Sequence, residues 1–136
     1  MFTPPLTEVC SATQIPQLSP LALAYLGDAV YELYIRSRYL WPPKRSQDYH
    51  NQVVAQVRAE TQAKHLRSLI PYFTPAELEI LRRGRNAATS GPKRVEREIY
   101  QHATSLETLI GYLYITDPQR LNQLLAKLEL DRKPEE

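Results

Sequence analysis

Three acidic side chains stand in segments that otherwise suit burial. Apart from Asp28 and Glu32, every residue from 21 to 35 is apolar, aromatic or glycine, and Glu107 is the only acid between residues 99 and 116. An ionised carboxylate moved out of water costs several kcal/mol unless it is paired or bound to a metal. Each of these acids therefore needs a partner.

Two kinds of partner fit these acids. If the carboxylates cluster, they repel each other and one takes up a proton unless a cation neutralises them. Oxygen ligands without a Cys or His cluster favour Mg²⁺, with Mn²⁺ as a substitute, over Zn²⁺. The ordinary alternative is a structural acid paired with Arg or hydrogen-bonded to one of the nine tyrosines. Spacing alone leaves both interpretations open.

Two long helices must position the acids. Ser19-Pro20 is typical of a helix start, and Pro42-Pro43 would end the helix near residue 40. Within it Asp28 and Glu32, four residues apart, lie about 40° from each other around the axis. Glu107 falls in a second predicted helix, 93–116. Both helices are apolar around most of their circumference, which predicts that they form the buried centre.

The remaining elements are also predicted to be helical, so the fold class is all-α with about five main helices. The other helices are expected at 46–70, 75–84 and 118–130, with a loop at 85–92. At 136 residues the chain is most simply one domain. Its expected organisation is an N-terminal arm at 1–18, a helical domain at 19–130 and a solvated tail at 131–136.

Positive charge is concentrated in one segment. The chain has 17 basic and 15 acidic residues, and a net charge of +2 does not by itself indicate a nucleic-acid partner. Between residues 82 and 94, however, there is no acid, and the candidate phosphate-binding residues are Arg82, Arg83, Arg85, Asn86, Lys93 and Arg94. The alternative is a solvated helix end whose arginines complement the helix dipole, which accounts for Arg82 and Arg83 only.

A second, weaker basic group lies at the first helix junction. Lys44, Arg45 and His50 would either contact phosphate or form a polar turn.

The compartment is predicted to be cytoplasmic. Cys10 is the only cysteine, so no internal disulfide can form, and the N-terminus has no basic start followed by an apolar run. Charges interrupt the apolar runs before the roughly 20 residues that a membrane span needs. We therefore expect no membrane partner.

Three motifs resemble a known family. LALAYLGDAVYELYIR, residues 21–36, resembles the signature helix of the ribonuclease III domain, and especially that of Mini-ribonuclease III. RRGRNA at 82–87, followed by a Lys-containing loop, and ATSLETLIGYLYI at 103–115 are similar to the rest of the Mini-III pattern. The resemblance covers roughly residues 18 to 130.

This resemblance implies an all-α endonuclease domain that acts as a homodimer on double-stranded RNA with Mg²⁺, each protomer cutting one strand. It also implies that the double-stranded RNA-binding domain of full-length ribonuclease III is absent. The family's named role is maturation of the 23S ribosomal RNA precursor in bacteria. The sequence does not identify any ribosomal protein that would assist this reaction.

The resemblance carries over to individual residues. Asp28 matches the signature aspartate and Glu107 the essential late glutamate, so these two are the expected catalytic residues and metal ligands. Two acids of the wider superfamily are replaced by Ala24 and Thr104, as is typical of the Mini-III branch. Glu32 and Thr104 are then candidates to lie beside the metal without binding it, and Glu32 is alternatively a structural partner.

Two other classes of function compete with the enzyme. The first is a catalytically inactive RNA-binding or ribosome-assembly protein with the same fold, and the second is a helical adaptor that binds protein. The presence of both Asp28 and Glu107 favours the enzyme, because a binding module gains nothing from burying two carboxylates.

Overall fold

The chain is built from helices. The computed structural model describes residues 9–89 and 96–130, and within these ranges it contains no strand. The elements are η1 (Ile15–Gln17), α1 (Pro20–Tyr39), α2 (Ser46–Val57), α3 (Ala59–Leu69), η2 (Ile70–Tyr72), α4 (Pro75–Ala87), α5 (Arg97–Thr116) and α6 (Pro118–Leu125). The all-α class is confirmed.

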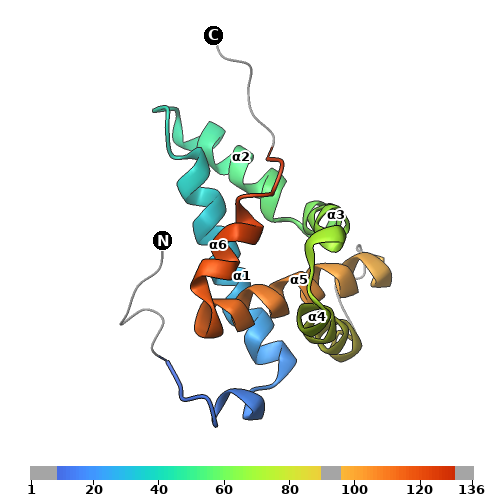
Figure 1. Ribbon diagram of the computed structural model, residues 1–136. Coiled ribbons are helices and arrows are strands. Elements are labelled where there is room, and N and C mark those ends of the chain that lie inside the picture. Colours follow the sequence, from blue (N-terminus) through green and yellow to red (C-terminus); the bar gives the residue numbers. More distant parts are fainter. Residues whose placement is uncertain (1–8, 90–95, 131–136) are drawn as a thin grey trace.

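Helices α1 and α5 cross at the centre of the molecule (Figure 1). At the crossing the two backbones are in direct contact through glycines: a Cβ on Gly27 would lie 1.8 Å from the carbonyl oxygen of Glu107, and a Cβ on Gly111 would lie 1.9 Å from that of Leu23. No side chain fits at either position. The two helices that the sequence marks as central are therefore locked together at the level where the acids lie.

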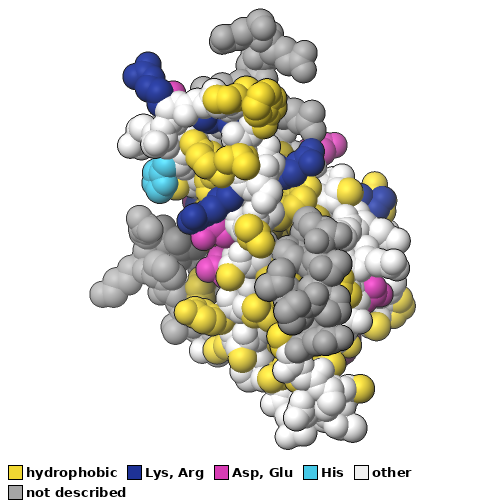
Figure 2. Space-filling view, turned by 90° about the vertical axis from the view of Figure 1, so that its left-hand side faces the viewer, with side chains coloured by type: hydrophobic (Ala, Val, Ile, Leu, Met, Phe, Trp, Pro, Cys, Tyr) yellow, Lys and Arg dark blue, Asp and Glu magenta, His cyan; other side chains and the backbone are white. Residues whose placement is uncertain are grey.

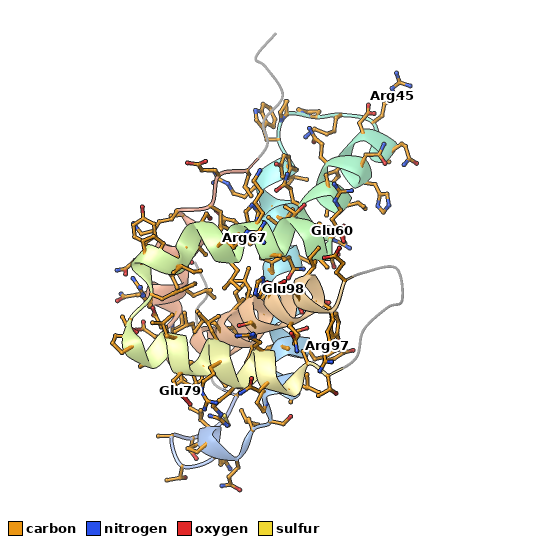
Figure 3. The ribbon with its side chains drawn as sticks, turned by 90° about the vertical axis from the view of Figure 1, so that its right-hand side faces the viewer. Arg45, Glu60, Arg67, Glu79, Arg97 and Glu98 are labelled. Carbon is orange, nitrogen blue, oxygen red and sulfur yellow. The ribbon has the colours of Figure 1, made fainter. Side chains whose placement is uncertain are left out.

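The other helices cover this crossing. Figure 3 shows α3 and α4 on either side of α5, with Glu79 on the outer side of α4 and with Arg97 and Glu98 at the start of α5. The core between them is aliphatic and aromatic, and its most completely buried side chains include Tyr31, Ile35, Leu109 and Leu121. Among the described residues, no helix has both the length and the apolar character that crossing a membrane requires.

The single helix expected at 46–70 is wrong, because the chain breaks at Arg58. Arg58 has an extended backbone conformation, with ψ at 156°, and separates α2 from α3. Side chains replace the backbone donors that a continuous helix would supply to the last carbonyls of α2. The carbonyls of Ala55, Gln56 and Val57 accept hydrogen bonds from Thr61 Oγ1, Tyr31 Oη and Gln62 Nε2, at 2.6, 2.9 and 2.7 Å.

Helix α4 continues beyond Gly84, so the expected end of this helix and the expected loop start at residue 85 are wrong. Gly84 does not adopt the left-handed conformation of a terminating glycine. It lies against α5 instead, where an added Cβ would be 2.4 Å from Thr108 Oγ1. The capping box between Thr74 and Glu77 starts this helix as predicted.

The two C-terminal helices are shorter than expected. Helix α5 starts at Arg97 rather than at residue 93, and residues 90–95 lie outside the described part. Helix α6 ends at Leu125 rather than near residue 130. The carbonyl of Leu125 accepts a hydrogen bond from Tyr34 Oη at 3.1 Å, which satisfies one acceptor at the helix end.

Candidate active site

The structure brings Asp28 and Glu107 together. Asp28 follows Gly27 on α1, and the backbone of Gly27 lies against the carbonyl of Glu107 on α5. The Glu107 side chain is in hydrogen-bonding contact with the Asp28 carboxyl. Asp28 is exposed and Glu107 is half-buried, so the pair lies at the boundary between core and solvent. A ligand can approach this pair from the Asp28 side.

The pair is electrostatically strained as two carboxylates. Burial, the hydrogen bond with Asp28 and the charge of Asp28 raise the pKa of Glu107 to about 8, while a hydrogen bond with Gln62 opposes this rise. At neutral pH without a cation the site therefore retains a proton. A divalent ion would compensate both charges and displace this proton.

Gln62 is the contributor to this site that sequence analysis missed. It lies on α3 and is only 3% exposed, and its side chain contacts both Glu107 and the Val57 carbonyl. The available signal was a polar side chain in the apolar row that includes Leu66 and Leu69. The acidic pair is thus framed by three helices, α1, α3 and α5.

Glu32 and Thr104 are placed differently from the pair. Glu32 forms an ion pair with Arg36, one turn further along α1, at 3.3 Å, and its side chain is 41% exposed. Thr104 is buried within α5, and its backbone carbonyl accepts a hydrogen bond from Thr108 Oγ1 at 2.8 Å. Glu32 is thus paired with an arginine of its own helix.

The basic segment is displayed on α4. Arg82, Arg83, Arg85 and Asn86 are all exposed, while Gly84 between them is buried. Arg82 is paired with Glu79, by a 3.0 Å hydrogen bond from Nε and a second bond from its terminal nitrogen. Lys93 and Arg94 lie outside the described residues. Arg83 and Arg85 are thus the clearest candidates for binding phosphate.

The second basic group forms part of a turn. Lys44 donates a hydrogen bond to the carbonyl of Tyr39, and its ammonium nitrogen lies 5.6 Å from the centre of the Tyr49 ring. Arg45 is 4.0 Å from Asp48. His50 is exposed and lines a hollow between α1 and α2. The contacts of Lys44 are with neighbouring residues of this turn.

The donors at the acidic pair fit a hard divalent ion. The two carboxylates offer only oxygen atoms, and the amide oxygen of the neighbouring Gln62 is buried without a hydrogen-bond partner among the described residues. In the same part of the chain, no group of three or more His, Cys, Asp or Glu side chains is placed to hold a metal. The pair can therefore supply only part of a coordination shell, as is usual for Mg²⁺.

An apolar surface runs along the outer side of α1. Leu21, Tyr25 and Leu33, spaced by four or eight residues, are 49%, 85% and 51% exposed. Towards the C-terminal half of α1, a hollow of about 210 Å³ lies between α1 and α2, lined by Glu32, Arg36, Ser46, Tyr49, His50, Val53 and Val54. Figure 2 shows one face of the molecule, on which exposed hydrophobic side chains surround a group of acidic and basic side chains.

Known proteins are similar to this chain over most of its length. The family model of the ribonuclease III domain matches residues 21–118. Mini-ribonuclease 3 of Synechocystis sp. is 59% identical over 119 residues, covering 88% of this chain and 83% of the relative. That of Gloeobacter violaceus is 50% identical over 112 residues, covering 82% and 83%.

A solved structure is also similar. A crystal structure of a Fusobacterium nucleatum protein superposes with a TM-score of 0.74 at 29% identity, covering 79% of this chain and 90% of that one. The family match includes Asp28, Glu107 and the basic end of α4. The chain therefore belongs to the ribonuclease III family, in its Mini-ribonuclease III branch.

Proposed function

We propose that this protein is an endoribonuclease that hydrolyses phosphodiester bonds in double-stranded RNA with Mg²⁺. The observation that carries the proposal is the contact between the Asp28 and Glu107 carboxyls at the crossing of α1 and α5. The named relatives are Mini-ribonucleases, which supports RNA as the substrate. Mn²⁺ is expected to substitute for Mg²⁺, since both prefer oxygen ligands.

Asp28 and Glu107 would hold the metal, and RNA oxygens and water would complete its shell. Such an ion would supply polarisation of the scissile phosphate, an activated water molecule and stabilisation of the leaving 3′ oxygen. The expected products carry 5′-phosphate and 3′-hydroxyl ends. Because the pair retains a proton at neutral pH, metal binding without RNA is expected to be weak and to release that proton.

The exposed side of α4 binds the RNA backbone. Arg83 and Arg85 on this helix, continued by Lys93 and Arg94 in the sequence, are suited to contact phosphate oxygens. The deep major groove of duplex RNA is hard to read, so recognition rests mainly on shape and backbone contacts. The secondary candidates are Arg82, Asn86, Lys44 and His50. Two of them, Arg82 and Lys44, already have partners within the protein.

The active form is a homodimer. One carboxylate pair cuts one strand, so a double-strand cut requires two sites related by a two-fold axis, which an isologous dimer provides. The apolar side of α1 and the adjoining hollow supply a surface for this contact. Tyr25 is 85% exposed, which is unusual for so large an aromatic side chain.

The physiological substrate is the 23S ribosomal RNA precursor, processed in the cytoplasm. This assignment follows the named role of the family that the chain belongs to. Cleavage of a transcript that contains the base-paired ends of that precursor, but not of a scrambled duplex at the same concentration, would support it. Equal cleavage of both would contradict it.

A cleavage assay separates the enzyme from an inactive RNA-binding protein of the same fold. Labelled duplex RNA and single-stranded RNA are incubated with the protein in Mg²⁺ or in EDTA and resolved on a denaturing gel. The enzyme is expected to cut only the duplex, and only in Mg²⁺. A duplex that is bound in a mobility-shift assay but stays intact at every Mg²⁺ concentration would favour the inactive binding protein.

A further inference from the structure

The amide of Gln62 is fixed at its nitrogen end. Nε2 donates to the carbonyl of Val57 at 2.7 Å, across the break between α2 and α3, and the same side chain hydrogen-bonds the Glu107 carboxyl. A glutamine amide nitrogen has two protons to donate, so one is available to Glu107 when the other is bonded to Val57. The orientation of the planar group is therefore set by one backbone acceptor and one acid of the candidate active site.

The oxygen end of the same amide is left without a donor. Among the described residues, Gln62 Oε1 is buried and has no hydrogen-bond partner, although the whole residue is only 3% exposed. Leaving a buried acceptor unpaired costs about 1–3 kcal/mol. The bond to the Val57 carbonyl explains the amide nitrogen but not the unpaired oxygen, so the oxygen indicates a role toward a ligand.

We infer that Gln62 is a positioning residue of the acidic site: Nε2 holds the Glu107 carboxylate facing Asp28, and Oε1 accepts a hydrogen bond from a water molecule on the divalent ion. The inference rests on the proposed metal site. Mg²⁺ and Mn²⁺ bound by few protein ligands keep several waters, and each water donates two hydrogen bonds. Groups that orient metal ligands and their waters commonly change metal affinity 10- to 100-fold when removed.

A matched pair of variants tests this role. Gln62→Met removes the donors and the acceptor at similar volume, whereas Thr61→Val removes only the hydrogen bond from Thr61 Oγ1 to the Ala55 carbonyl at the same helix junction. Mn²⁺ binding is measured by electron paramagnetic resonance of free Mn²⁺, with helix content followed by circular dichroism. Gln62→Met is expected to weaken Mn²⁺ binding about tenfold or more, and Thr61→Val is expected to leave it unchanged.

Three results would overturn the inference, and they differ in whether the proposed function also fails. If the wild-type protein binds Mn²⁺ and Gln62→Met binds it equally well, Gln62 has no role toward the metal, while the proposed function stands. Equal weakening of Mn²⁺ binding in Gln62→Met and Thr61→Val would show that only the helix junction matters, and the proposed function would again stand. If the wild-type protein binds no Mn²⁺ with or without RNA, the proposed metal site fails together with this inference.

A measurement on the unaltered side chain keeps the inference testable if Gln62→Met does not fold. The side-chain amide resonances of Gln62 are followed by nuclear magnetic resonance during Mg²⁺ addition. They are expected to shift in the wild-type protein and to stay constant in Asp28→Asn. Resonances of Gln62 that do not respond to Mg²⁺ in the wild-type protein, while backbone signals near Asp28 do, would contradict the role of Oε1.

Discussion

The contact between Asp28 and Glu107 costs stability when no metal is present. Folding raises the pKa of Glu107 from its ordinary value of 4.5 to about 8, mainly through burial and then through Asp28. A carboxyl with a raised pKa favours the folded state when it is protonated, so its favourable effect is complete below pH 4.5 and is lost as the pH rises towards 8. The acids are therefore retained at the expense of stability in the metal-free protein.

Replacing Glu107 should reveal this cost. In EDTA, Glu107→Gln is expected to be more stable than the wild-type protein at pH 8, with the difference shrinking towards pH 4.5, because glutamine cannot ionise. Thermal unfolding of both proteins between pH 4.5 and 8 measures the effect. Glu129→Gln, which changes an exposed acid, serves as the control. Parallel stability curves for Glu107→Gln and wild type would show that Glu107 is not held in a protonated state.

Single glycines decide how close the two central helices can come. A Cβ at Gly27 would collide with backbone atoms of Glu107, which cannot turn aside. A Cβ at Gly84 would meet the side chain of Thr108 first. Because Asp28 lies on α1 and Glu107 lies on α5, separating the two helices would also separate these two carboxyls.

Gly27→Ala is expected to destabilise the fold by about 3 kcal/mol, although alanine favours a helix by about 1 kcal/mol over glycine. Gly84→Ala should cost less, since a side chain can move more easily than a backbone. Chemical denaturation of the wild-type protein, Gly27→Ala and Gly84→Ala gives the free energy of unfolding of each. A Gly27→Ala protein as stable as Gly84→Ala would contradict the close backbone contact at the crossing.

Local signals in the sequence predicted the central helices but not the arrangement of their neighbours. Ser19-Pro20 fixed the start of α1, and the side chain of Ser19 does accept from the Ala22 amide. The break at Arg58 has no Pro or Gly to announce it, because it depends on donors such as Tyr31, which comes from a distant part of the chain. Gly84 has the sequence appearance of a helix end, whereas its role is packing against α5.

The candidate site was predictable only where its residues looked out of place. Asp28 and Glu107 are acids in apolar surroundings, so the sequence alone suggested that they meet. Gln62 is neutral, and glutamine is common on helix surfaces. It becomes part of the site through its burial and its contact with Glu107, which the packing of α3 against α5 creates.

At the scale of the whole molecule, binding of RNA depends on where the positive charge lies. Replacing Arg83 and Arg85 together by alanine is expected to reduce the slope of log affinity against log salt concentration by about two, because each arginine neutralises about one phosphate. Filter binding of duplex RNA across a salt series measures this slope. Lys127→Ala is the control, because Lys127 lies beyond α6 and over the Tyr72 ring. An unchanged slope in the double variant would place RNA elsewhere.

Assembly of the dimer should depend on the exposed apolar side of α1. Tyr25→Asp is expected to convert the dimer to a monomer without unfolding it, because the residue is 85% exposed within one chain. Sedimentation velocity reports the change, and Gln119→Asp, at an exposed position on α6, should stay dimeric. A wild-type protein that sediments as a monomer while cutting both strands would rule out the two-fold arrangement.

The most direct test is single-turnover cleavage of labelled duplex RNA by Asp28→Asn and by Glu107→Gln at saturating Mg²⁺. If both carboxylates hold the reacting ion, each variant should cut about 10³-fold more slowly or not at all, since several kcal/mol of transition-state stabilisation is lost. Both should still fold and bind the duplex. Cleavage at the wild-type rate by either variant would contradict the account.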